Sequence, residues 1–110
     1  MTDPVIPAPA SAMVDAINSG DTEAFVDSFV VDGYVDDWGR ILRGHDGIRS
    51  WSETDAIGME AQMTVLSAET DGNTTSIHFE WASQRFTGES DGIFAISGSK
   101  LASFTIPPHR

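Results

Sequence analysis

The sequence predicts one α+β domain in which three N-terminal helices pack on a curved antiparallel sheet. Up to about residue 56, most apolar residues recur at helical spacing, and one short strand interrupts the helices. From about residue 60, apolar and polar residues alternate, and glycine-containing turns separate the alternating runs. Helices that precede a series of adjacent strands favour an arrangement with the helices on one face of an antiparallel sheet.

Two helices are predicted between Pro9 and Val31, joined by a hinge at Gly20 and Asp21. Proline suits the first turn of a helix, where its missing N–H has no helical partner to lose. Glycine readily adopts the left-handed conformation that follows a helix end. The carboxylate of Asp21 can then accept hydrogen bonds from the free N–H groups of the second helix.

The third helix is predicted from Gly44 to about Ala56. Ile48 and Trp51 are three residues apart, so their side chains lie on the same face of this helix. Both side chains are apolar and suit the face that packs on the sheet. We therefore expect Trp51 to be almost completely buried.

The first strand is predicted at residues 34–38, after a turn at residues 32–33. The other strands follow the third helix, at residues 60–70, 74–86, 90–97 and 100–106. In the strand at residues 74–86, the face expected to be buried holds Thr75, Ile77, Phe79 and Trp81. The opposite face is mixed in polarity and is expected to be exposed; it holds Ser76, His78, Glu80, Ala82 and Gln84.

Acidic residues outnumber basic ones by 17 to 6, which gives a formal net charge of −11. Such a field repels phosphate groups and anionic lipid, so nucleic acid and membrane surfaces are poor partners. The chain has no cysteine, which excludes disulfides, thiolate metal sites and cysteine nucleophiles. Residues 1–8 contain closely spaced prolines and no basic run, so we expect an extended arm before a single domain at residues 9–110 of a cytoplasmic protein.

Several runs of the sequence resemble the NTF2-like/SnoaL-like superfamily. AINSGDTEAF, at residues 16–25, is similar to the link between the first two helices of the family. DGYVDDWG and RGHDGIRSW, at residues 32–39 and 43–51, are similar to its first strand and third helix. GIFAI and KLASF, at residues 92–96 and 100–104, sit where its last two strands belong. The resemblance implies a cone-shaped roll with an internal pocket, and a homodimer that pairs through the exposed face of the sheet.

Asp36 and Asp37 are the sharpest chemical feature of this pattern. Neighbouring residues of a strand point to opposite faces, so one of the two at most can face the interior. Val35 is the best apolar candidate for the core and shares its face with Asp37, whereas the inverse parity would place Asp36 inside. The resemblance implies that Asp37 holds the position of the general base, where Trp and Phe walls would disfavour its charged form. Alternatively, both aspartates are solvated or cap a turn.

The other catalytic groups of the superfamily are incomplete in this sequence. The oxyanion-binding positions of the isomerases fall at Met13 and near Gly92, which carry no side-chain donor, so steroid isomerisation is not expected. Cyclases of the family use a histidine with an aspartate, which makes His45 or His78 a candidate partner of Asp37. Epoxide hydrolases of this fold need an Asp–Arg–Asp set, and the motifs assign its arginine to none of Arg40, Arg43 and Arg85.

The expected ligand is a small apolar molecule, bound without a metal or another cofactor, because no acidic or histidine cluster has metal-ligand spacing. Besides Asp37 and His45 as catalytic candidates, the residues expected to bind this ligand are Tyr34, Asp36, Trp38, Trp51, Phe79, Trp81 and Phe94. If the protein is an enzyme, the expected chemistry is proton transfer of the isomerase, cyclase or dehydratase type. The alternative is a binding or oligomerisation module without catalysis, in which Trp and Phe side chains fill the cavity.

Overall fold

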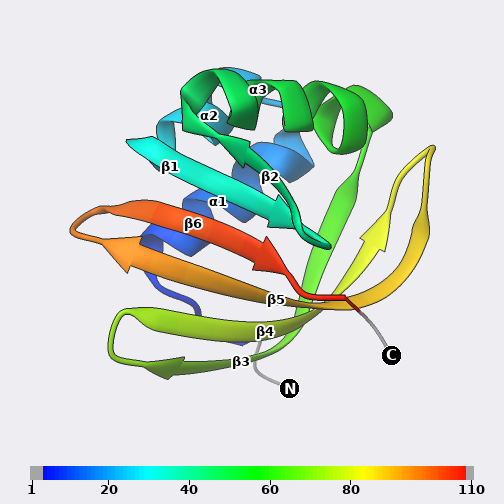
Figure 1. Cartoon of the computed structure of the whole chain (residues 1–110). Coiled ribbons are helices and arrows are strands. Elements are labelled where there is room, and N and C mark those ends of the chain that lie inside the picture. Colours follow the sequence, from blue (N-terminus) through cyan, green and yellow to red (C-terminus); the bar gives the residue numbers. More distant parts are fainter. Residues whose placement is uncertain (1–3, 109–110) are drawn as a thin grey trace.

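The computed structural model describes residues 4–108, which form helices packed against one curved six-stranded sheet (Figure 1). The elements are α1 (Ala8–Ser19), α2 (Thr22–Asp27), β1 (Phe29–Asp37), β2 (Arg40–Arg43), α3 (Gly44–Asp55), the 3-10 helix η1 (Ile57–Met59), β3 (Gln62–Asp71), β4 (Thr74–Ala82), β5 (Thr87–Ser97) and β6 (Lys100–Ile106). The strands lie side by side in the order β2-β1-β6-β5-β4-β3. The α+β class predicted from the sequence is confirmed.

The link between α1 and α2 forms as the sequence predicts. Gly20 has a φ of 72° and closes α1 by donating its N–H to the carbonyl of Ile17, at 3.2 Å. The Oδ1 atom of Asp21 then accepts the N–H of Ala24 at 3.1 Å, which caps α2. Of the predicted arm, residues 1–3 lie outside the described part of the chain, and Ala8 already belongs to α1.

The prediction of three N-terminal helices is not exact, because a β-hairpin separates α2 from α3, and only the first strand of this hairpin was predicted. This hairpin consists of β1 and β2, which pair antiparallel, with Asp36 opposite Ile41. The sequence does not indicate β2, because this strand has four residues, and none of them is buried. Its apolar and polar side chains therefore follow no alternation between a core face and a solvent face.

The first strand is longer than predicted, because Asp32 and Gly33 form no turn. Strand β1 begins at Phe29 and runs through both residues, so α2 ends at Asp27 and not near Val31. At Gly33, a Cβ atom would lie 3.1 Å from the carbonyl oxygen of Ala102, so glycine permits the close approach of β1 and β6. These two strands pair parallel, whereas the other neighbouring strands pair antiparallel, so the sheet is mixed and not purely antiparallel as predicted.

Strand β4 has the predicted alternation, with Thr75, Ile77, Phe79 and Trp81 buried on one face. It ends at Ala82 because Ser83 closes a turn, in which its N–H donates to the carbonyl of Phe86 at 2.9 Å. The Oγ atom of Ser83 also accepts the N–H of Phe86 at 3.0 Å. Residues 83–86 are therefore a compact loop, and Gln84 does not belong to the outer face of the sheet.

The core lies between the α-helices and the sheet, and an aromatic cluster is centred on Trp51 of α3. The Trp51 side chain is 1% exposed, which confirms its predicted burial. Its ring centroid lies 5.9 Å from that of Phe25, 5.9 Å from that of Trp81 and 6.5 Å from that of Phe104. None of the helices in the described part of the chain is long and apolar enough to cross a membrane.

Candidate functional site

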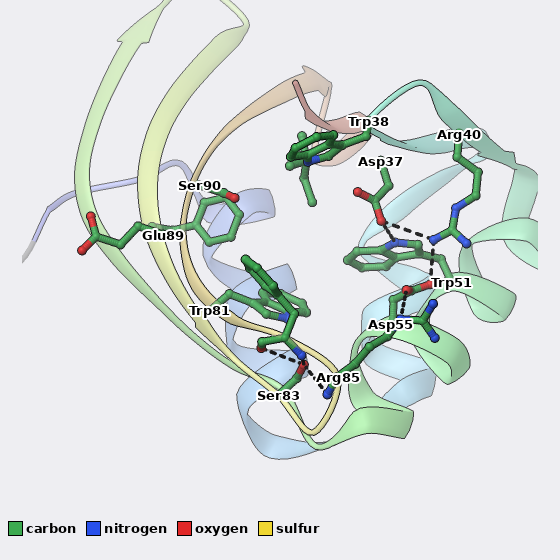
Figure 2. Close-up of a pocket in the computed structure, with 13 residues that line it drawn as sticks. Asp37, Trp38, Arg40, Trp51, Asp55, Trp81, Ser83, Arg85, Glu89 and Ser90 are labelled. Carbon is green, nitrogen blue, oxygen red and sulfur yellow. Dashed lines mark hydrogen bonds and ion pairs between the residues drawn. The ribbon is translucent and has the colours of Figure 1, made fainter. Parts of the chain in front are cut away.

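A cavity of about 740 Å³ opens between the end of β1, helix α3 and the loop that joins β4 to β5 (Figure 2). Its apolar lining consists of Trp38, Trp51, Phe79, Trp81, Phe86 and Ile106. Its polar lining consists of Asp37, Arg40, Asp55, Ser83, Arg85, Glu89 and Ser90. A volume of several hundred Å³ with mainly apolar walls and a few convergent polar groups is typical of small-molecule sites.

The pleat of β1 directs its two aspartates to different places. Val35 is fully buried, and Asp37, two residues on, shares its face and lines the cavity. Asp36 points the other way, and its Oδ1 atom accepts the N–H of Gly39 at 2.8 Å. Asp36 therefore caps the β1–β2 turn and does not line the cavity, whereas Asp37 does.

Two donors hold one oxygen of Asp37. The indole N–H of Trp51 donates to Oδ2 at 3.1 Å, and Nη2 of Arg40 donates to the same atom at 3.3 Å. The other oxygen, Oδ1, accepts no hydrogen bond from residues 4–108. The Asp37 side chain is 23% exposed. One oxygen is thus fixed by the protein, and the other is available to a molecule in the cavity.

A second carboxylate, that of Asp55, shares the guanidinium of Arg40. Its Oδ2 atom accepts hydrogen bonds at 2.7 Å from Nη2 of Arg40 and at 2.7 Å from Oγ1 of Thr54. Its Oδ1 atom lies 3.5 Å from Nε of Arg85. The hydrogen bond that Arg40 donates to Asp55 is the main cause that raises the pKa of Arg40, so this guanidinium stays charged. Asp37, Arg40, Asp55 and Arg85 form a chain of alternating charge along the cavity.

The aromatic walls differ in how far the rest of the protein covers them. Trp51 and Trp81 are buried at the base, with ring centroids 5.9 Å apart. Trp38 and Phe86 are each 54% exposed, although both are large apolar residues. Trp38 follows β1 and Phe86 precedes β5, so the two come from different hairpins. An apolar ligand would therefore meet buried rings below and exposed rings at the mouth.

Four of the residues predicted to bind a ligand line this cavity together with Asp37: Trp38, Trp51, Phe79 and Trp81. The structure places the other three elsewhere. Asp36 caps the turn, and the guanidinium of Arg43 lies 5.0 Å from the ring centre of Tyr34. Phe94 is fully buried, and its ring stacks on that of Phe104 with centroids 4.9 Å apart.

The two candidate histidines do not line the cavity. His45 lies in the first turn of α3, and its Nε2 atom is 3.0 Å from the carbonyl oxygen of Phe29, at the far end of β1 from Asp37. His78 lies on the outer face of the sheet, with Nδ1 2.8 Å from Asp91 and Nε2 2.7 Å from Glu89. The hydrogen bond to Asp91, followed by that to Glu89, raises the pKa of His78 above its usual value.

The oxyanion-binding positions of the isomerases carry only apolar surroundings here. Met13 is fully buried in the core. At Gly92, a Cβ atom would lie 2.8 Å from the Phe104 ring and 3.1 Å from the Phe79 ring, so neighbouring rings occupy the space of any side chain. No donor for an enolate oxygen therefore comes from these two positions.

Sequence reasoning missed Asp55 and the whole loop at residues 83–86. One signal for Asp55 was present, because an acidic residue in the last turn of a helix faces the negative end of the helix dipole. Asp55 is the last residue of α3, and that turn holds no basic residue. A partner outside the helix, here Arg40, offsets the unfavourable placement. A signal for the loop was present as well, because Ser83, Gln84 and Arg85 are all polar and interrupt the alternation of the strand.

The sequence matches no family model and no curated protein. The structure resembles that of a putative polyketide cyclase from Sinorhizobium meliloti, with a TM-score of 0.81, 21% identity, and coverage of 92% of this chain and 94% of that chain. A protein with a ketosteroid isomerase-like fold from Catenulispora acidiphila, in complex with trimethylamine, gives a TM-score of 0.79, 19% identity and coverage of 94% and 87%. The structure also resembles that of SalBIII, an epoxide hydrolase/cyclase-like enzyme with a role in pyran ring formation in the polyether salinomycin. This pair gives a TM-score of 0.78, 14% identity, and coverage of 90% of this chain and 86% of that chain.

These superpositions cover nearly the whole length of both chains in each pair. The chain has the NTF2-like fold. An NTF2-like protein from Cytophaga hutchinsonii also superposes with a TM-score of 0.78, so the resemblance that the sequence runs indicated is confirmed at the level of fold. NTF2-like proteins include enzymes and binding domains, so the activity has to be argued from the residues of this cavity.

Proposed function

We propose that this NTF2-like chain is an acid–base enzyme of the cyclase or hydrolase type, with Asp37 as the general base acting on an apolar ligand in the cavity. The observation that carries this proposal is the asymmetry of the Asp37 carboxylate. Trp51 and Arg40 hold Oδ2 at 3.1 and 3.3 Å, whereas Oδ1 accepts no hydrogen bond within residues 4–108. A general base must be held in a fixed orientation and still reach the proton that it removes.

In the proposed step, Oδ1 of Asp37 takes the proton of a hydroxyl group that belongs to water or to the ligand. The hydroxyl oxygen forms a bond to an electrophilic carbon, and the bond from that carbon to an epoxide oxygen breaks. Arg40 stabilises the negative charge on the released oxygen, which then takes a proton from solvent at the cavity mouth. Asp37 returns its own proton to solvent, so the step needs no other reactant.

The chain Asp37–Arg40–Asp55 supports this reaction class over isomerisation. Arg40 Nη2 lies 3.3 Å from Asp37 and 2.7 Å from Asp55, which supplies the Asp–Arg–Asp set that the family resemblance requires of epoxide hydrolases. The isomerase positions at Met13 and Gly92 lack donors. The similar proteins of known structure include one titled a putative polyketide cyclase and one titled epoxide hydrolase/cyclase-like, which supports the same class.

The test compares two neighbouring aspartates of β1 on opposite faces. Styrene oxide and a series of hydroxy-epoxides are incubated with the protein, and diol or cyclic ether formation is followed by proton NMR. Asp37→Asn should lower the rate by at least about 100-fold, because it removes the base. Asp36→Asn keeps an oxygen for the Gly39 N–H and should retain the rate. Equal rates for Asp37→Asn and the parent would overturn the assignment of the base.

The second candidate function is ligand binding without catalysis. It is favoured by the two hydrogen bonds that hold Oδ2 of Asp37, because a carboxylate held in this way also suits a side chain that orients a ligand without removing a proton. The cavity of about 740 Å³ supports a ligand over the alternative of a filled core. If this function holds, Asp37→Asn retains ligand affinity, and neither it nor the parent converts any epoxide.

A homodimer through the outer face of the sheet, in a cytoplasmic protein, remains part of the proposal. Ser76, Glu80 and Ala82 are exposed on this face of β4, and His78 is half-buried between acidic neighbours. An interface here should bury at least about 1,000 Å². Light scattering at micromolar concentration should give the mass of two chains, and the mass of one chain would exclude the dimer.

A further inference from the structure

Arg85 reaches the cavity from the loop between β4 and β5, on the side opposite the end of β1. Ser83 fixes the backbone of this loop, because its Oγ accepts the N–H of Arg85 at 3.2 Å and the N–H of Phe86 at 3.0 Å. Figure 2 shows the Arg85 side chain extending from this loop toward Asp55 of α3. The guanidinium is therefore positioned at the cavity by a rigid turn and not by a flexible tail.

Most of the donors of Arg85 are unused within the described part of the chain. Its one ion pair within residues 4–108 joins Nε to Oδ1 of Asp55 at 3.5 Å, which is long for a hydrogen bond. Asp55 does not depend on it, because Arg40 and Thr54 already donate to Oδ2, each at 2.7 Å. The two terminal nitrogens of Arg85 contact no acceptor in this part of the chain, and the side chain is 62% exposed. Two N–H-bearing nitrogens in one plane thus remain available.

The charged residues that line the cavity allow an anion to bind next to Arg85. Asp37 and Asp55 are offset by Arg40 and Arg85. Glu89 also lines the cavity, but its carboxylate binds His78 on the outer face, and Figure 2 shows the side chain pointing away from the cavity. The chain as a whole carries −11, so an anion would be repelled without a local cation. Arg85 provides that cation beside apolar walls.

We propose that Arg85 is an anion subsite that takes the carboxylate of an apolar ligand, while the reacting end of that ligand lies at Asp37. This inference rests on the proposed function in assuming that the cavity binds a ligand. A planar guanidinium matches a carboxylate through two parallel N–H···O bonds, which gives orientation as well as affinity. Because Asp37 and Arg85 stand at opposite ends of the chain of alternating charge, a ligand held at Arg85 would present its far end to the base. The substrate class is thus an apolar carboxylic acid, bound as the carboxylate.

The experiment uses one neutral reporter and a matched pair of competitors. N-phenyl-1-naphthylamine, an uncharged dye that fluoresces in apolar sites, is bound to the full chain. It is then displaced with 2-naphthoate or with 2-naphthamide, which has the same shape and no charge. The parent should bind naphthoate at least about 10-fold more tightly than naphthamide, which corresponds to about 1.4 kcal/mol. Arg85→Gln should abolish this preference in a protein that still binds the dye, and Arg85→Lys should keep part of the preference.

Arg43→Gln is the matched control, because Arg43 lies over the Tyr34 ring and does not line the cavity. This variant should keep the preference for naphthoate. Equal affinity for the two competitors in the parent, or a preference that survives Arg85→Gln, would overturn the subsite while the cavity remains a ligand site. If the folded parent does not bind the dye at all, the ligand site of the proposed function fails and the subsite fails with it.

Discussion

The two ends of the sheet use different residues at the first position of their two-residue turns. At one end, which we call the turn end, Gly72 begins the β3–β4 turn with a φ of 62° and Gly98 begins the β5–β6 turn with a φ of 64°. At the other, the cavity end, Trp38 begins the β1–β2 turn with a φ of 57°. Glycine adopts this conformation freely, whereas a bulky side chain there is strained. The cavity end therefore keeps a residue that the backbone disfavours.

The difference indicates which end was shaped by something other than folding. A Cβ atom at Gly72 or Gly98 would meet nothing within 4 Å, so the backbone conformation alone accounts for glycine there. Trp38 is strained and 54% exposed, and both features disfavour tryptophan. Strained residues gather at ligand clamps and active sites, where a functional gain offsets about 1–3 kcal/mol. In this protein the gain would be the aromatic surface that Trp38 adds to the cavity mouth.

The largest effect is expected where the cavity end meets the core, at Trp51. Trp51→Ala should lower the free energy of unfolding by about 3–5 kcal/mol, because it leaves a large void among Phe25, Trp81 and Phe104. Urea denaturation measures this change. Trp51→Phe is the control, since it keeps most of the packing and removes the N–H that holds Asp37. An unchanged urea denaturation midpoint for Trp51→Ala would contradict the packing of Trp51 in the core.

Substitutions at the turns should have a smaller effect on the free energy of unfolding, and its sign should differ between the two ends. Trp38→Gly should raise the free energy of unfolding by about 1 kcal/mol, because glycine relieves the positive φ. Gly72→Ala should lower it by about 1 kcal/mol for the same reason. Trp38→Gly should also weaken binding of N-phenyl-1-naphthylamine, which Gly72→Ala should leave unchanged. If both substitutions lower stability, the strain attributed to Trp38 is absent.

The smallest effect on stability is expected from the ion pairs of His78. This residue lies on the outer face of the sheet and belongs to neither end. Carboxylates at both ring nitrogens favour the charged imidazolium and raise its pKa, with Asp91 as the larger cause. Because the pKa is higher in the folded state, the pair stabilises the fold below pH about 6.5 and this contribution disappears as the pH rises through the folded-state pKa. Imidazole NMR titration should give a lower pKa in Asp91→Asn than in the parent. A pKa of His78 that does not change in this variant would refute the pairing.

The sequence predicted best where burial and periodicity act together. The alternation of β4 and the inward position of Trp51 on α3 follow from the need to bury one face, and both are found in the structure. Prediction failed where local signals competed with tertiary contacts. Asp32 and Gly33 resemble a turn, but Gly33 lies inside β1, where the close packing against β6 favours a residue without a side chain.

The polar part of the site was only partly predictable for a different reason. The position of Asp37 follows from the parity of one strand, which is local information. Its connection to Asp55 through Arg40 joins a hairpin to the end of a helix 15 residues later in the chain. No periodicity encodes such a contact. Arg85 comes from a loop that the sequence presents as the end of a strand, so its place at the cavity depended on the turn made by Ser83.

The central claim is that the cavity end is a ligand site, and the three tryptophans of the chain report on it directly because all of them line the cavity. The measurement is a titration of the ¹⁵N-labelled protein with N-phenyl-1-naphthylamine, observed in the indole and backbone N–H signals. We predict that the indole signals of Trp38, Trp51 and Trp81 shift in a saturable way, while the backbone signals of Gly72 and Gly98 stay in place. Shifts at the two glycines with unmoved indole signals would contradict the account.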